Sequence, residues 1–287
     1  AQHDLPLLVR KGQPAEELEK LIGETGAEAV FWNRRYEPAA IDHDKALKAK
    51  LKDRGLAVFS FNSSLLFEPL HLRNKAGKPF KVFTPFWRHC QTLEIDKPRL
   101  VKLANAVSPK AELESLEVDD LKLLPTIEWD AQFFDFWDPT LKGAKNRLRS
   151  FVESRVADYP EGRDRPAVDG TSLMSPYLHF GQISPRELFE TFRRKDLLGD
   201  AAAKKYLAEI GWREFSYHLL FHFPQTPDEP LYEDFKQFPW EADEAALRAW
   251  QKGKTGYPMV DAGMRQLWAV GWMHNRVRMI VASFLVK

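Results

Sequence analysis

The sequence predicts an α/β domain built on a parallel sheet, followed by an all-α domain. Two observations predict this class. In about the first third of the chain, short apolar runs alternate with segments of helical periodicity, and beyond residue 129 only helical patterns occur. Strands that alternate with helices are joined by right-handed crossovers and form a parallel sheet. We therefore expect an α/β domain over residues 1–95, a linker over residues 96–128 and a helical domain over residues 129–287.

The elements of the first domain follow from the spacing of apolar residues. Continuous apolar runs predict strands at residues 5–9, 29–32 and 56–61. Helical periodicity predicts helices at residues 14–26, 42–55 and 84–93. No glycine-rich dinucleotide fingerprint is present at the first strand, so no phosphate binding is predicted at the loop that follows it.

The second half reads as a series of helices behind a connecting segment. Residues 96–128 are charged, interrupted by proline and weakly periodic, which is typical of a linker. The sequence Ser184-Pro-Arg-Glu187 is a capping box with proline in the first turn, and it predicts a helix start. Helices are expected at residues 139–156, 185–194, 201–221 and 243–252, and as a pair joined at Gly271 within residues 256–279.

Composition narrows the classes of function. The net charge is only +1, so a nucleic-acid partner would need a local basic patch. The one cysteine, Cys90, excludes an intrachain disulfide framework and suits a reducing compartment. No Cys/His spacing indicates a structural zinc site, and no metal is predicted. The longest apolar run, residues 280–286, is far too short to span a membrane, and no membrane partner is expected.

Both ends of the chain look interrupted. It begins at Ala1 rather than at a methionine, and it stops at Lys287 inside a helical pattern with no capping signal. We therefore expect the chain to be a fragment of a longer protein.

A mixed stripe of side chains is the most informative feature of the C-terminal helices. Trp272, Asn275, Arg276 and Met279 are spaced at i, i+3, i+4 and i+7, which predicts one helical face, with Arg278 on another. An indole, an amide, a guanidinium and a thioether are unusual for a core face, where Leu, Ile and Val dominate. From the spacing alone, a buried helix with a charged rim explains the stripe equally well.

The residues of this stripe belong to a string that resembles a known family. Gly271-Trp-Met-His-Asn-Arg-Val-Arg-Met279 closely resembles a signature of the DNA photolyase/cryptochrome flavoproteins. Two further motifs agree in order and spacing. The run from Thr171 to Gly181 is similar to the family's pyrophosphate-binding loop, and Trp212-Arg-Glu-Phe215 is similar to its substrate helix. The resemblance covers essentially the whole chain. It implies a Rossmann-like antenna-type domain without its first strand and an all-α FAD-binding domain without its C-terminal part.

The resemblance implies FAD as the cofactor, reduced and anionic in the active state. Its expected contacts are Tyr159, Thr171, Ser172, Leu173, Met174, Ser175, Tyr206, Arg213 and Arg278. From the residues alone, the Ser/Thr-rich turn suits a phosphate cradle, although such turns usually just cap helices. An antenna chromophore is left unassigned, because Ala39-Ala40 replace the Asn-Glu pair that holds a folate in some members; a deazaflavin, a folate bound in another way and no antenna at all stay open.

The resemblance also assigns the residues that would meet DNA. Glu209 and Asn275 would bond the edges of damaged pyrimidines, while Trp212 and Met279 would wall the pocket. Arg163 and Arg276 would contact DNA phosphates; on its own, Arg163 is equally a solvated surface arginine. Trp240 matches the solvent end of a tryptophan electron-transfer chain, although from the residues alone an exposed packing tryptophan is the simpler interpretation.

Taken together, the resemblance implies a class I photolyase, a carbon–carbon lyase that splits cyclobutane pyrimidine dimers by electron transfer from photoexcited reduced FAD. Asn275-Arg276 stand where the 6-4 branch typically has paired histidines, which favours cyclobutane dimers as substrate. The expected partner is UV-damaged DNA, whose pyrimidine dimer would be flipped into the pocket. The protein is expected to be a monomer and, if the source is bacterial, to be cytoplasmic and associated with the nucleoid when bound to DNA. Two alternatives stay open. One is a cryptochrome-type blue-light receptor; the other is a flavin-free helical DNA-binding remnant, if the chain truly ends at Lys287.

Overall fold

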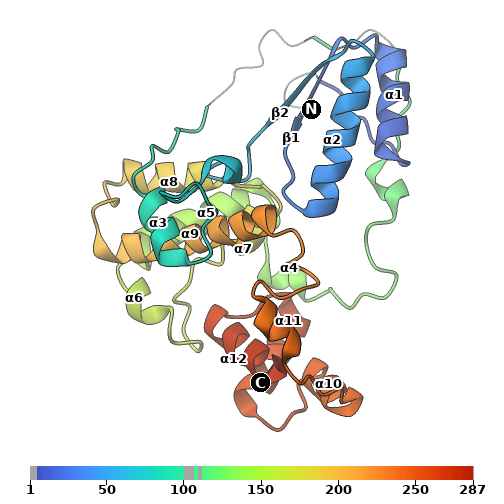
Figure 1. Cartoon of the computed structure of the whole chain (residues 1–287). Helices are drawn as coiled ribbons and strands as arrows, with labels where there is room; N and C mark the ends of the chain where they lie inside the picture. The colour runs from blue at the N-terminus through green and yellow to red at the C-terminus, as the bar shows by residue number, and fades with distance from the viewer. Residues whose placement is uncertain (1–4, 100–106, 109–111, 287) are drawn as a thin grey trace. The chain divides into compact units, whose positions relative to one another are not determined.

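The computed structural model describes residues 5–99, 107–108 and 112–286 (Figure 1). Contacts group the chain into two units, one of residues 1–64 with 97–127 and the other of residues 65–96 with 128–287. The domain division predicted from the sequence stays a prediction, and its linker lies partly outside the described residues. None of the described helices is both long enough and apolar enough to cross a membrane.

The first unit contains a small parallel sheet. Its helices and strands are α1 (Pro14–Thr25), β1 (Ala29–Asn33), α2 (Pro38–Asp53) and β2 (Ala57–Phe61), with the short 3₁₀ helix η2 at Val118–Leu121. The strands pair in parallel with Ala29 opposite Ala57, as the alternation of strands and helices predicts. Ile22, Leu47, Leu51 and Val58 form its small core.

The prediction of a strand at residues 5–9 is wrong. Within the described residues the sheet has two strands, and this segment pairs with neither. Val9 instead donates its backbone N–H to the Ser115 hydroxyl (2.9 Å), and its carbonyl accepts from Leu116. Leu7 is 80% exposed, so the apolar run does not mark a buried strand here.

The regular elements described in the second unit are all helices, and over residues 129–287 this agrees with the helical pattern of the sequence. Its longer helices are α3 (Phe83–Cys90), α5 (Leu141–Ser154), α8 (Pro185–Arg194), α9 (Ala201–His222), α10 (Glu244–Gln251), α11 (Pro258–Val270) and α12 (Asn275–Val286). Shorter helices are η1 (Pro69–His71), α4 (Phe133–Phe136), α6 (Tyr159–Gly162), α7 (Ser175–His179) and η3 (Glu233–Gln237). Ser184 caps α8, as the sequence predicts, and the structure adds Thr140 as the cap of α5 and Asp200 as the cap of α9.

Two hydrophobic cores organise this unit. The larger one includes Phe86, Phe151, Phe192 and Tyr206, and it joins α3, α5, α8 and α9. The smaller one is formed by Val260, Met264, Met273, Val277 and Val281 from α11, α12 and the turn between them, which lie side by side (Figure 1). Close packing needs glycine in both cores. A Cβ on Gly211 would lie 2.5 Å from the Trp87 ring, and one on Gly263 would lie 2.4 Å from Val277.

Polar side chains of α9 hold residues 66–80, the segment that precedes α3, against that helix. Three side chains spaced four residues apart on α9 bond backbone groups of residues 66–80. Glu214 accepts the N–H groups of Leu66 (2.8 Å) and Phe67 (3.2 Å), and His218 Nε2 accepts the N–H of Phe80 (3.0 Å). His222 lies 2.9 Å from the carbonyl of Pro69. Burial lowers the pKa of His218 to about 4, so this imidazole is neutral and free to accept.

Glu214 makes the stability of the fold depend on pH. Burial raises the pKa of its carboxyl from 4.5 to about 7, because desolvation outweighs the Arg213 charge and the two backbone N–H groups. The folded state therefore holds the Glu214 proton more tightly than the unfolded chain does. The stability that this proton contributes is complete below pH 4.5 and is lost as the pH rises towards about 7.

We expect Glu214→Gln to remove this part of the pH dependence, because the amide keeps an oxygen acceptor but does not titrate. As the pH rises from 4.5 to 7, the free energy of unfolding of the natural protein should fall relative to that of the variant by on the order of 1–3 kcal/mol. Denaturant unfolding at several pH values measures the difference, with Glu241→Gln, an exposed carboxyl, as the control. Parallel pH profiles for the natural protein and Glu214→Gln would contradict the expectation.

Candidate functional site

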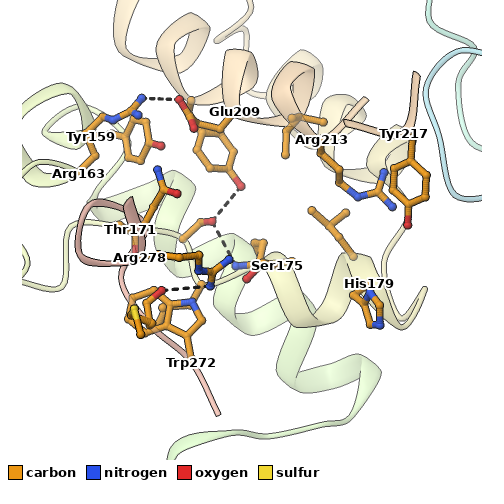
Figure 2. Close-up of a pocket in the computed structure, with 18 residues that line it drawn as sticks. Tyr159, Arg163, Thr171, Ser175, His179, Glu209, Arg213, Tyr217, Trp272 and Arg278 are labelled. Atoms are coloured by element: carbon orange, nitrogen blue, oxygen red, sulfur yellow. Dashed lines mark hydrogen bonds and ion pairs between the residues drawn. The ribbon is translucent and has the colours of Figure 1, made fainter. Parts of the chain in front are cut away.

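A cavity of about 430 Å³ lies among α6, the segment before α7, α9 and the start of α12. Figure 2 shows Glu209, Arg213 and Tyr217 along one wall, with Trp272 and Arg278 across from them. The lining residues are Tyr159, Arg163, Thr171, Ser172, Leu173, Met174, Ser175, Leu178, His179, Tyr206, Glu209, Ile210, Arg213, Tyr217, Trp272, Met273, Asn275 and Arg278. Twelve of these are residues that the sequence analysis singled out for cofactor or DNA contact.

The segment of residues 170–175 forms the floor of the cavity, and it packs closely against α6 because residue 170 is a glycine. A Cβ on Gly170 would lie 2.5 Å from backbone atoms of Gly162, so the two chain segments touch through their backbones. Leu173 has a φ of 54°, which is unusual for a side chain of this size and indicates a tightly held turn. Ser172 is buried; its hydroxyl oxygen accepts from the Tyr206 hydroxyl (3.0 Å) and from the Met174 N–H (3.3 Å).

One face of α9 forms the second wall. Its lining residues Tyr206, Glu209, Ile210, Arg213 and Tyr217 have helical spacing, so they share a side of the helix. Burial raises the pKa of Tyr206, which keeps this phenol neutral and able to donate. The Arg213 guanidinium lies 5.0 Å from the centre of the Tyr217 ring. This cation–π contact helps to fix the position of the guanidinium on the cavity wall.

The third wall differs from the stripe that the sequence predicts. α11 ends at Gly271, which has a φ of 70°, and α12 begins only at Asn275. The Nδ1 atom of His274 accepts the backbone N–H of Arg276 (3.2 Å) and so caps the new helix. Trp272 therefore precedes the helix instead of sharing a helical face with Asn275. The cavity is lined by Asn275 and Arg278, while Arg276 and Met279 are not among its lining residues.

Several other expected residues also lie outside the cavity lining. Trp212 is 47% exposed and stacks on Phe83, with ring centroids 3.8 Å apart. Trp240 is 62% exposed beside Phe238 and precedes α10. Met279 is 56% exposed, and its sulfur lies 3.6 Å from Nη1 of Arg276.

Some lining residues were not predicted from the sequence. Ile210 and Tyr217 follow from Tyr206 by helical spacing on α9, so the sequence carried a signal for them. Leu178, His179 and Met273 come from α7 and from the turn before α12. No spacing rule connects these two segments, so their meeting could not be read from the sequence.

Two ion pairs lie at the edge of the cavity lining, one between the lining residues Arg163 and Glu209 and one between Asp164 and Arg276, which do not line it. Nη1 of Arg163 lies 2.6 Å from Oε1 of Glu209, and the Arg163 side chain is only 10% exposed. Beyond it, Nε of Arg276 lies 2.6 Å from Oδ1 of Asp164. Both pairs join α6 or the residues just after it to a neighbouring helix. Each pair is neutral overall, so the two arginines add no net positive charge while their carboxylate partners hold them.

The cavity suits a ligand with an anionic part and a flat apolar part. The guanidinium groups of Arg213 and Arg278, with the hydroxyls of Thr171 and Ser175, can bind phosphate oxygens. Met174, Leu178 and Ile210 provide apolar surface for a ring system. The volume lies within the usual range for cofactor sites.

Two family models match the chain. A model described as "DNA photolyase" matches residues 1–104, and one described as "FAD binding domain of DNA photolyase" matches residues 206–287. The deoxyribodipyrimidine photo-lyase of Agrobacterium fabrum is 46% identical over 98% of this chain and 59% of its own length. Cryptochrome-2 of Arabidopsis thaliana is 38% identical over 92% of this chain and 45% of its own length.

A solved structure supports the same fold and corrects one prediction. The crystal structure of a bacterial class III photolyase from Agrobacterium tumefaciens has a TM-score of 0.90 and 45% identity, covering 96% of this chain and 58% of that one. The expected class I is therefore not supported. This chain spans 59% of the length of the Agrobacterium fabrum photo-lyase and 45% of that of the plant cryptochrome-2.

We expect Gly170→Ala to push the floor of the cavity away from α6, because the new Cβ would overlap the Gly162 backbone. The overlap should lower stability by about 1–3 kcal/mol. Thermal unfolding measures the loss, with Gly199→Ala as the matched control, because no atom lies within 4 Å of a Cβ added there. If both variants melt alike, the two backbones do not touch as described.

Proposed function

This chain belongs to the photolyase/cryptochrome family, and from that premise we propose that the protein is a deoxyribodipyrimidine photo-lyase, a light-dependent DNA repair enzyme. Its substrate would be the cyclobutane pyrimidine dimer in UV-damaged DNA, bound by a monomer. In a bacterium this reaction takes place in the cytoplasm, where the chromosome lies. Because an Agrobacterium structure of 45% identity is a class III photolyase, we assign this chain to that branch.

The observation that carries the proposal is the composition of the cavity. One wall and the floor offer groups suited to FAD, namely Arg213, the residues 171–175 and Tyr159. Glu209 and Asn275, which can bond the edge of a base, line the same cavity. A site with only a structural role has no need to combine anion-binding groups with base-binding groups around 430 Å³ of space.

The residues present fit FAD. Arg213 and Arg278 would neutralise its phosphates together with Thr171 and Ser175, and Ser172, Leu173 and Met174 would shape the floor. Tyr206, held by Ser172, would support the ring system. When bound and reduced, FAD supplies a light-driven electron donor. No antenna chromophore is assigned: a folate, a deazaflavin and no antenna at all stay open.

The chain's own residues would bind and orient the DNA. Glu209 and Asn275 would bond the pyrimidine edges of the flipped dimer and stabilise charge that develops on it. Trp212 and Met279, both about half exposed, would contact the dimer from outside the cavity. Arg163 and Arg276 would bind phosphates, which gives salt-dependent affinity with little sequence preference. Trp240, exposed at the surface, would receive electrons from a reductant in solution.

A second candidate is a blue-light receptor of the cryptochrome type. The 38% identity to the plant cryptochrome-2 favours it. A receptor needs the flavin groups of the cavity but not the base-binding pair Glu209 and Asn275, so repair activity separates the two functions.

We expect the full-length protein with reduced FAD to convert dimer-containing DNA to monomers under blue light but not in the dark. In Glu209→Ala the yield should fall about tenfold, the scale of one hydrogen bond to a charged group, while FAD content stays unchanged. Chromatography of the DNA measures the yield, and Glu128→Ala, an exposed carboxylate outside the cavity, is the control.

Three results would contradict the repair function or its site. Activity in the dark, or none under light with reduced FAD bound, argues against a photolyase. Loss of FAD from Glu209→Ala would mean that this carboxylate serves the cofactor instead of the dimer.

A further inference from the structure

Four charged side chains, two of which line the cavity, form a row of alternating sign. Glu209 pairs with Arg163 (2.6 Å), and Nε of Arg163 lies 3.8 Å from Oδ1 of Asp164. The same Asp164 oxygen accepts from Nε of Arg276 at 2.6 Å. The row runs from a cavity-lining carboxylate on α9, through the end of α6, to the first turn of α12. Asp164 stands between the two arginines and is 51% exposed.

The Asp164 carboxyl is held in its charged form at neutral pH. The hydrogen bond from Arg276 is the main cause that holds the pKa of Asp164 below its usual value. His274, buried near the same groups, adds no charge, because burial and then the Arg276 charge lower its pKa. Each arginine that the proposed function assigns to a DNA phosphate therefore already has a carboxylate partner from the chain itself.

We propose that Asp164 is a specificity-determining residue that withholds Arg276 from DNA phosphates until Glu209 engages a flipped dimer. This inference rests on the proposed function. It assigns Asp164, which has no part in cofactor or base contact, the task of weakening the binding of undamaged DNA.

The coupling follows from how the partners can exchange. Undamaged duplex offers no flipped base, so Glu209 keeps Arg163. A phosphate that takes Arg276 then leaves Asp164 negative and close to a second negative charge, which is unfavourable. A flipped dimer instead donates pyrimidine N–H to Glu209. That bond loosens the hold of Glu209 on Arg163, which can then compensate Asp164 across the present 3.8 Å gap while Arg276 moves to the phosphate.

The competing explanation is a structural tether. The Asp164–Arg276 pair also joins the end of α6 to α12, and it could serve only to hold α12 against the cavity. The two explanations predict opposite effects on DNA binding. Removing a tether should weaken the binding of both kinds of DNA, whereas removing a restraint should strengthen the binding of undamaged DNA.

The test measures binding in the dark by full-length, FAD-loaded protein to two duplexes that differ only in one thymine dimer. In Asp164→Asn, affinity for the undamaged duplex should rise roughly fivefold, the scale of one exposed ion pair. Affinity for the dimer duplex should change less than about twofold, so the ratio of the two affinities falls. Asp158→Asn, which removes one exposed charge six residues earlier, should change both affinities alike. Thermal unfolding and FAD content confirm that each variant is folded.

Two outcomes overturn the inference. One is an unchanged affinity ratio in Asp164→Asn; the other is weaker binding to both duplexes, which a tether predicts. Arg276→Ala separates this failure from that of the proposed function. Because Arg276 is withheld from undamaged DNA, this variant should lower affinity for the dimer duplex and reduce the salt slope of that binding by about one, with little change for the undamaged duplex. If Arg276→Ala changes neither that affinity nor its salt slope, the proposed phosphate contact fails and this inference fails with it. If it changes both while Asp164→Asn keeps the ratio, only this inference fails.

Discussion

The two-sided chemistry of α9 is the constraint on which the helical unit depends. One side carries Glu214, His218 and His222, whose polar atoms meet the backbone of residues 66–80. Another presents Tyr206, Glu209 and Arg213 to the cavity. Because Arg213 and Glu214 are consecutive and their side chains are 3.3 Å apart, the buried anchor and the cavity wall are linked directly. Three side chains fix the C-terminal half of α9 to the backbone of residues 66–80, and the helix so anchored can hold the cavity groups in a defined register.

The charged groups beside the cavity are paired with one another. A net charge of +1 gives no general attraction for DNA, yet Arg163 and Arg276 stand together beside the cavity. Each is matched by a carboxylate, so the protein presents cations that are held in place but not freely available. Such an arrangement favours discrimination over raw affinity, because a ligand must displace a partner to use either arginine. The proposed repair of rare lesions in a large excess of undamaged DNA needs this kind of selectivity.

Much of the fold could be predicted from the sequence, because its signals are local. Helical periodicity and the Ser184 capping box placed the longer helices of the second unit within a few residues, although the helix expected from residue 139 begins at Leu141 behind a Thr140 cap. The prediction of a strand at residues 5–9 is wrong, because an apolar run does not specify which strand it would pair with. The face of α12 was also misjudged, because Gly271 and the His274 cap delay the helix until Asn275. The role of Glu214 was missed, since only tertiary structure brings the Leu66 and Phe67 backbone to it.

The cavity residues named in advance came from family resemblance more than from physics, and their roles in catalysis stay proposals. The most direct measurement is a crystal structure of the full-length protein with FAD and a duplex that contains one thymine dimer. We expect FAD in the cavity, against Arg213 and Arg278, with the dimer near Glu209 and with Arg276 moved from Asp164 to a phosphate. FAD bound elsewhere, or a dimer that makes no contact with Glu209 or Asn275, would contradict the assignment of this cavity.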